Sequence, residues 1–114
     1  MLRDEEESQI SEELPYFEIT SILEKRIRVT KSYWQKLVTT KHPRIRGKEK
    51  EIQDALEKTD EIRRSRTDSN VYLYYKKKRD HYICAVVKHL NDEGFLITAY
   101  FTKTMKIGEV IWKK

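Results

Sequence analysis

The sequence is poor in the residues that build disulfide frameworks, metal sites and phosphate-binding loops. Cys84 is the one cysteine among 114 residues, which excludes an internal disulfide framework and a zinc site with several cysteine ligands. The three glycines stand alone, so the chain has no glycine-rich phosphate loop. It also lacks a Walker lysine, an HExxH motif and a nucleophile elbow. We therefore expect neither a metal nor another cofactor.

Long apolar runs are also missing. No stretch approaches the ~18 apolar residues of a membrane span, and the first residues, MLRDEEESQ, lack the apolar core of a secretory signal. A chain of this length is expected to form one domain. We expect a cytoplasmic protein without membrane association. Residues 1–15 would form an acidic, flexible leader, and residues 16–114 a single folded domain.

The charge is distributed unevenly along the chain. It carries 24 Lys and Arg against 19 Asp and Glu, a net charge of +5. Residues 1–18 hold seven acids and one base, so the remainder carries a net +11. Such a basic body is typical of a protein that binds a polyanion, nucleic acid above all; a solvated, lysine-rich surface is the simpler alternative. The acidic leader is either a disordered tail or a nucleic-acid mimic that lies over the basic surface until nucleic acid displaces it.

Hydrophobic periodicity predicts helices first and strands afterwards. Alternation around Ile27 and Val29 indicates a strand that leads to Thr30, a helix N-cap. Helical spacing then predicts two helices, over about residues 31–40 and 47–58, with Trp34, Leu37, Val38, Ile52, Ala55 and Leu56 buried. Period-two patterns predict strands over residues 61–65, 71–78, 81–90, 95–102 and 109–112. This order predicts an α+β fold, in which an N-terminal strand and two helices pack on one face of a four- to five-stranded antiparallel sheet.

Strand alternation divides the predicted sheet into an apolar and a polar face. In FLITAYFT, alternation places Phe95, Ile97, Ala99 and Phe101 on one face and Leu96, Thr98, Tyr100 and Thr102 on the other. We expect the apolar set to lie under the helices. The other face would stay open and collect Thr98, Tyr100, Thr102, Lys88, Tyr82, Tyr72 and Tyr74 or Tyr75. Such a face suits a polar, planar ligand.

One reaction needs neither metal nor cofactor: transfer of an RNA phosphoester to its own 2′-hydroxyl. It requires a base, a cation that stabilises the negative charge developing around phosphorus, and an acid that protonates the leaving oxygen. His42 is the candidate proton carrier, with a helix-terminal cap as its alternative role. Arg64 with Lys88 would meet the phosphate charge, and Thr98 or Tyr100 would orient a phosphoryl oxygen.

Two further segments are candidates for RNA binding. In IRRSRTD, strand geometry places Arg64 with Arg66 on one face and Arg63 with Ser65 on the other. Two arginines on one face can bind one phosphate. Alternatively, they form an exposed basic edge that discourages pairing with another strand. The run VYLYYKKK contains residues suited to base stacking and phosphate contact, or simply to β structure: Tyr72, Tyr74, Tyr75 and Lys76. His81 and His89 read as ordinary surface residues.

The ordered set of motifs HP, RRS, YY, VVK, ITAY and GEVIW, over about residues 25–112, resembles a known family. It is similar to the phage- and prophage-associated nucleases related to barnase, EndoU, colicin and RelE-like ribonucleases. The resemblance implies a RelE/barnase-like α+β fold and metal-independent RNA cleavage by a toxin or phage-associated effector. By position it assigns functional roles to His42, Arg63, Arg64, Ser65, Lys88, Thr98 and Tyr100.

The leading hypothesis from the sequence is therefore a small metal-independent endoribonuclease. Two alternatives come from other classes. One is an RNA-binding module without catalysis that uses the same face, and it predicts binding that weakens with salt. The other is an interaction domain whose basic surface meets an acidic protein, such as an antitoxin.

Overall fold

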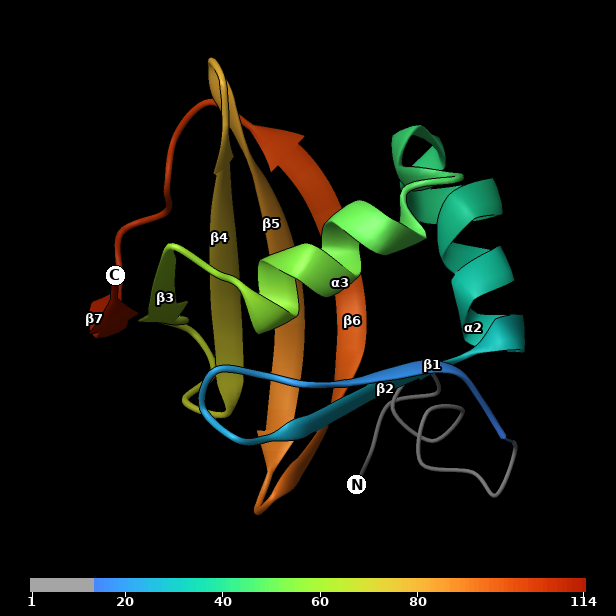
Figure 1. Ribbon diagram of the computed structural model, residues 1–114, viewed down its shortest axis with the longest axis horizontal. Coiled ribbons are helices and arrows are strands. Elements are labelled where there is room, and N and C mark those ends of the chain that lie inside the picture. Colours follow the sequence, from blue (N-terminus) through green and yellow to red (C-terminus); the bar gives the residue numbers. More distant parts are fainter. Residues whose placement is uncertain (1–13) are drawn as a thin grey trace.

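The computed structural model describes residues 14–114 (Figure 1). Most of the expected leader, residues 1–13, lies outside the described residues, while Pro15 already belongs to the first strand. The elements in chain order are β1 (Pro15–Thr20), β2 (Arg26–Thr30), α2 (Lys31–Lys36), the π-helical η1 (Leu37–Lys41), the 3₁₀ turn η2 (Pro43–Ile45), α3 (Glu49–Glu57), β3 (Glu61–Arg64), β4 (Val71–Lys78), β5 (His81–Leu90), β6 (Glu93–Thr102) and β7 (Glu109–Lys113).

The described strands form one seven-stranded mixed sheet in the order β1-β2-β6-β5-β4-β3-β7. Neighbouring strands are antiparallel except for β2 and β6, which run parallel. The expected four- to five-stranded antiparallel sheet is therefore wrong. The hairpin β1–β2 extends one edge, and β7 crosses from β6 to the opposite edge beside β3. Alternation along a strand marks which residues are extended, but it does not specify the partner strand, so these long-range pairings were not predictable.

The first helix begins at the residue that the sequence predicts. The Thr30 hydroxyl accepts a hydrogen bond from the Tyr33 amide at 3.2 Å, which confirms the N-cap. The α-helical part of the first helix is shorter than expected, because α2 gives way after Lys36 to η1, a wider π-helical turn. That turn ends at Lys41, and its C-cap His42 has left the helical conformation, as expected for the residue before Pro43.

One face of the sheet carries the main core. In Figure 1, α3 lies across β4, β5 and β6. The residues predicted for both helix stripes are buried here, together with the inward side chains of the strands: Trp34, Leu37, Val38, Ile52, Ala55, Leu56, Ile62, Tyr74, Ile83, Ala85, Val87, Leu96 and Ala99. The helical residues predicted to be buried therefore lie in the core, but two short helices and a seven-stranded mixed sheet replace the layers expected from the sequence.

A bulge in β6 changes the predicted faces. The register moves between the pairs Val86–Thr98 and Val87–Leu96, so β6 holds an extra residue there. Leu96 consequently joins Ala99 in the core under the helices, although strict alternation placed them on opposite faces. A bulge shifts the period by one residue, and the even run of apolar residues in β6 does not show where it falls.

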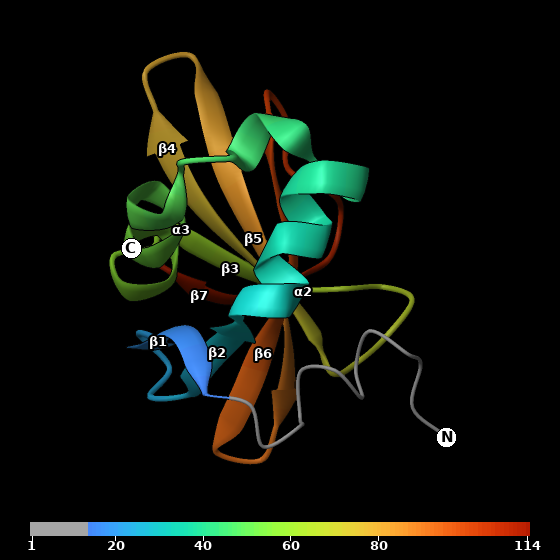
Figure 2. The same ribbon diagram turned by 90° about the vertical axis from the view of Figure 1, so that its right-hand side faces the viewer.

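The opposite face is not open. Residues 103–108, the crossover segment between β6 and β7, pass over it, and Figure 2 shows this segment and α3 on opposite sides of the sheet. Met105 packs on a second cluster formed by Leu73, Tyr75 and Cys84. The Lys106 amide donates to the Tyr75 hydroxyl at 2.9 Å. The expected exposed face of hydroxyls and aromatics is therefore wrong in its central part.

Close packing fixes the end of the crossover segment. A Cβ atom built on Gly108 would collide with the backbone carbonyl oxygen of Arg64. Arg63 also holds this segment, because its Nη1 donates to the Lys106 carbonyl at 2.8 Å. These contacts bring β7 beside β3.

Candidate nucleic-acid interface

The structure brings together only part of the predicted catalytic set. The rings of His42 and Tyr100 lie 6.1 Å apart at an interplanar angle of 29°. His42 reaches this position because η1 ends beside the outer edge of β6, where no described strand pairs beyond Phe95. His42 and Tyr100 therefore share one surface recess.

The two predicted hydroxyls do not point into that recess. The Thr98 and Tyr100 oxygens are buried and make no hydrogen bond to the described residues. Burial raises the pKa of the Tyr100 hydroxyl well above its usual value, and the nearby Cys84 and Tyr75 raise it further. Burial also raises the pKa of the Cys84 thiol to about 11. Tyr100 thus offers its ring to the surface and keeps its hydroxyl inside.

The two predicted phosphate-binding cations lie elsewhere. Lys88 pairs in register with Phe95, five residues before Tyr100 along β6, which is roughly 16 Å at the usual strand rise. Its Nζ lies 3.8 Å from an Asp68 oxygen. Arg64 lies over the Tyr72 ring at 5.4 Å and 3.6 Å from Glu109. The expected convergence of Arg64 and Lys88 on His42 does not occur.

The RRS segment has a structural role in this fold. Arg63 Nε lies 2.6 Å from a Glu61 oxygen, and the Ser65 hydroxyl accepts the Thr67 amide in a turn. The strand ends at Arg64 rather than Ser65, so Arg66 is exposed in the following loop and shares no strand face with Arg64.

The tyrosines of β4 do not form a stacking surface. Tyr74 and Tyr75 are 0% exposed, on opposite faces of the sheet, and are unavailable to bases. Tyr72 is partly buried, with its ring stacked on His89 at 4.0 Å. Lys76 lies 3.6 Å from Asp60. The aromatic residues of VYLYYKKK thus belong mainly to the two cores.

His89 is buried, contrary to its interpretation as a surface residue. It is 8% exposed, and its Nε2 lies 3.0 Å from the Tyr74 hydroxyl. That hydroxyl donates to Ser21 Oγ at 3.0 Å. Desolvation lowers the pKa of His89 to about 4, with a further contribution from the charge of Lys25. The signal was present in the sequence, because His89 alternates in phase with Ile83, Ala85 and Val87.

A cluster of cations lies where the β4–β5 turn, the end of β6 and the η1–η2 turns meet, at the top of Figures 1 and 2. We call it the basic end: Lys41, Arg44, Lys48, Lys77, Lys78, Arg79, Lys103 and Lys106. Asp80 is the acid of the adjoining turn, and it contacts His81 at 3.1 Å. The seven cations other than Lys41 form no ion pair with a described residue.

Two neighbouring recesses open at the basic end. The first, the His42 recess, has a volume of about 440 Å³ and is lined by Lys41, His42, Pro43, Arg44, Ile45, Tyr100 and Phe101. The second, the His81 recess, has about 590 Å³ and is lined by Arg44, Lys48, Asp80, His81, Phe101, Thr102 and Lys103. Arg44 and Phe101 border both. The sequence singled out His42 and Tyr100 but not the cations around them, such as Arg44 and Lys103, because those cations come from separate turns and strand ends.

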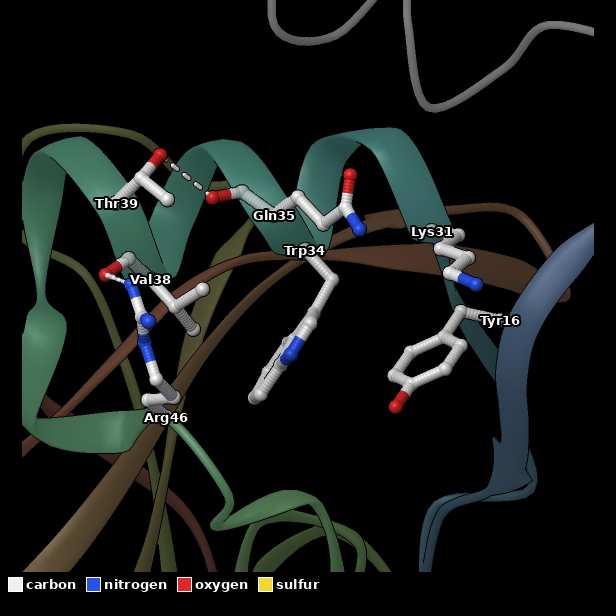
Figure 3. Close-up of a pocket in the computed structure, with 7 residues that line it drawn as sticks. All are labelled: Tyr16, Lys31, Trp34, Gln35, Val38, Thr39 and Arg46. Carbon is white, nitrogen blue, oxygen red and sulfur yellow. Dashed lines mark hydrogen bonds between the residues drawn. The ribbon is translucent and has the colours of Figure 1, made fainter.

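A third recess lies away from the basic end, between β1 and α2. Figure 3 shows Trp34 and the Tyr16 ring facing it, with Lys31 and Arg46 near its two sides. The Tyr16 hydroxyl donates to a Glu49 oxygen at 2.7 Å, and Arg46 Nη2 donates to the Val38 carbonyl. The Tyr16 and Arg46 side chains are thus engaged with the protein itself.

Among residues 14–114, no three His, Cys, Asp or Glu side chains gather as metal ligands would. In the same part of the chain, no helix combines the length and the apolar character that crossing a bilayer requires. Comparisons with protein-family models, curated proteins and solved structures found no match to this chain.

Proposed function

We propose that this protein binds RNA through the basic end. The observation that supports the proposal is the gathering of eight lysines and arginines around two recesses with aromatic walls, beside one aspartate. Cations that approach a phosphate backbone release condensed counterions, and this supplies most of the affinity of a sequence-independent contact. Elsewhere many cations are already paired, such as Arg63 with Glu61 and Lys88 with Asp68.

The contrast between two exposed arginines tests this proposal. Arg44 borders both recesses, whereas Arg66 lies in the loop after β3. We expect Arg44→Ala to weaken RNA binding and to reduce the salt slope by about 1, whereas Arg66→Ala leaves both unchanged. Fluorescence anisotropy with labelled RNA at several salt concentrations measures both quantities. Equal effects of the two substitutions would contradict the placement of RNA at the basic end.

A second candidate function, metal-independent RNA cleavage, is favoured by the surroundings of His42. This imidazole lies in a recess whose wall includes Lys41 and Arg44. His42 would accept the proton of the 2′-hydroxyl as the 2′-oxygen bonds to phosphorus, and Arg44 would stabilise the charge on the pentacoordinate phosphorus. The bond from phosphorus to the 5′-oxygen then breaks, and the leaving oxygen takes a proton from water or from the protonated His42. These cations replace Arg64 and Lys88 in the role expected from the sequence.

Digestion of mixed RNA in the presence of EDTA tests this second function. Active protein should give fragments that end in a 2′,3′-cyclic phosphate, and His42→Ala should lower the rate about a hundredfold or more. His89→Gln is the matched control, because His89 lies in the core away from the recess. Intact RNA with the wild-type protein would remove the catalytic proposal and leave the binding proposal standing.

A further inference from the structure

We infer that the ligand of the basic end is single-stranded RNA, with two successive bases placed in the His42 and His81 recesses on either side of Phe101. This inference rests on the proposed RNA binding and specifies its substrate class. The first observation behind it is that the two recesses are adjacent and share Arg44 and Phe101 as a common border.

The recesses have the size and the lining of base-binding sites. Their volumes, about 440 and 590 Å³, fall within the ~300–1,000 Å³ of typical small-ligand pockets. Each has planar rings in its wall. In the first, the rings of His42 and Tyr100 stack at an interplanar angle of 29°, and in the second the rings of His81 and Phe101 meet edge to face at 5.5 Å. Planar walls of this kind favour stacking by a base.

Only an unpaired strand can place bases in such recesses. The bases of a duplex are stacked and paired, so a protein reaches their edges and not their faces. Single strands splay their bases onto aromatic side chains, a contact that contributes about 1–3 kcal/mol per base. The outer edge of β6 past Phe95 is paired with no described strand, so the approach to both recesses is not blocked by a neighbouring strand.

The cations occupy the positions that such a strand requires. A phosphate joins each pair of successive bases, and Arg44 is the exposed cation at the border between the two recesses. Lys41 lines the first recess, whereas Lys48 and Lys103 line the second. Basic side chains therefore line both proposed base sites and the border between them.

The test compares three polyanions: a single-stranded RNA of roughly twelve nucleotides, the same sequence as a duplex, and polyphosphate, which has no bases. We expect the single strand to bind about tenfold more tightly than the duplex, because only it gains the stacking contacts. Polyphosphate should bind most weakly at equal charge. No binding to any of the three would refute the proposed function itself, whereas equal binding of single strand and duplex would refute only the present inference.

Variants at Phe101 locate the base sites. Phe101 packs partly on the core, so Phe101→Leu is the primary variant, because it keeps apolar volume and removes the aromatic ring. We expect it to weaken single-strand binding about fivefold to tenfold and to leave duplex and polyphosphate binding unchanged. Tyr16→Ala is the matched aromatic control, from the recess of Figure 3. An equal loss for all three polyanions, or no loss in a variant whose thermal unfolding is normal, would overturn the inference.

Discussion

The imidazole of His42 lies 6.1 Å from the ring of Tyr100, whose hydroxyl is turned away from it into the protein. The two residues are 58 positions apart in the sequence, and they meet because η1 ends beside the unpaired edge of β6. The ring of Tyr100 belongs to the surface recess, whereas its oxygen belongs to the second core with Tyr75 and Cys84. Ring and hydroxyl of the same side chain therefore have different roles.

Removal of the Tyr100 hydroxyl tests this division. A buried hydroxyl without a hydrogen-bond partner costs free energy, so Tyr100→Phe should leave the free energy of unfolding unchanged or raise it by about 1 kcal/mol. RNA affinity should stay the same, because the ring remains. Urea denaturation and anisotropy measure the two quantities. A loss of stability above ~1 kcal/mol would mean that the oxygen is hydrogen-bonded, to Tyr75 or Cys84.

His89 predicts a pH dependence of stability. Its pKa is lowered to about 4 in the folded state by burial and by Lys25, against an unfolded value near 6.5. The unfolded chain therefore binds the extra proton between these values, so stability is complete above about pH 6.5 and falls as the pH drops toward 4. The limiting slope is about 1.4 kcal/mol per pH unit.

The comparison that isolates this effect uses His89→Gln. We expect the free energy of unfolding of the wild type to decrease between pH 7 and 5 relative to that of the variant. His42 and His81 are present in both proteins, so their contributions cancel. Parallel pH profiles of the two proteins would show that His89 titrates normally in the folded state.

The crossover segment predicts an unequal response of two neighbouring residues. Ile107 is 76% exposed, whereas a Cβ on Gly108 would collide with the Arg64 carbonyl. Gly108→Ala should lower the free energy of unfolding by about 1–3 kcal/mol, because the backbone must move. Ile107→Ala should change it by less than about 0.5 kcal/mol. Similar values for the two substitutions in urea denaturation would contradict the close contact of this segment with β3.

The acidic start of the sequence predicts an effect on RNA affinity. Residues 1–13 contain six acidic residues and one arginine, so their removal makes the protein more basic. We expect the shortened protein to bind RNA several-fold more tightly at low salt, with the difference vanishing near 1 M salt, where screening acts within ~3 Å. A full-length variant with these acids replaced by serine is the control for chain length. If this serine variant binds RNA with the affinity of the wild type, the acidic charge does not weaken RNA binding.

Local structure was predictable from the sequence, and its assembly was not. The N-cap at Thr30, the buried stripe of Ile52, Ala55 and Leu56, and the extent of β4 and β5 follow from spacing and side-chain chemistry within a few residues. The parallel pairing of β2 with β6 depends on contacts between residues about 67 positions apart, for which local periodicity gives no signal.

The candidate site could likewise be predicted only in part from the sequence. His42 and Tyr100 were singled out by residue type and do lie together, whereas Arg64 and Lys88 carry suitable charges but pair with Glu109 and Asp68. Arg44 and Lys103 went unnoticed, because they gain their position only when η2 folds beside the end of β6. Charge in a sequence thus indicates a polyanion ligand, but only the fold determines which cations remain available to it.

The most direct test of RNA binding at the basic end is the salt dependence of that binding in two matched double variants. Arg44→Ala with Lys103→Ala removes two cations from the basic end, whereas Lys36→Ala with Lys58→Ala removes two exposed lysines elsewhere. If RNA binds at the basic end, the slope of log K against log salt falls by about 1.4–1.8 in the first variant and does not change in the second. Equal slopes in both variants, or a larger fall in the second, would contradict RNA binding at the basic end.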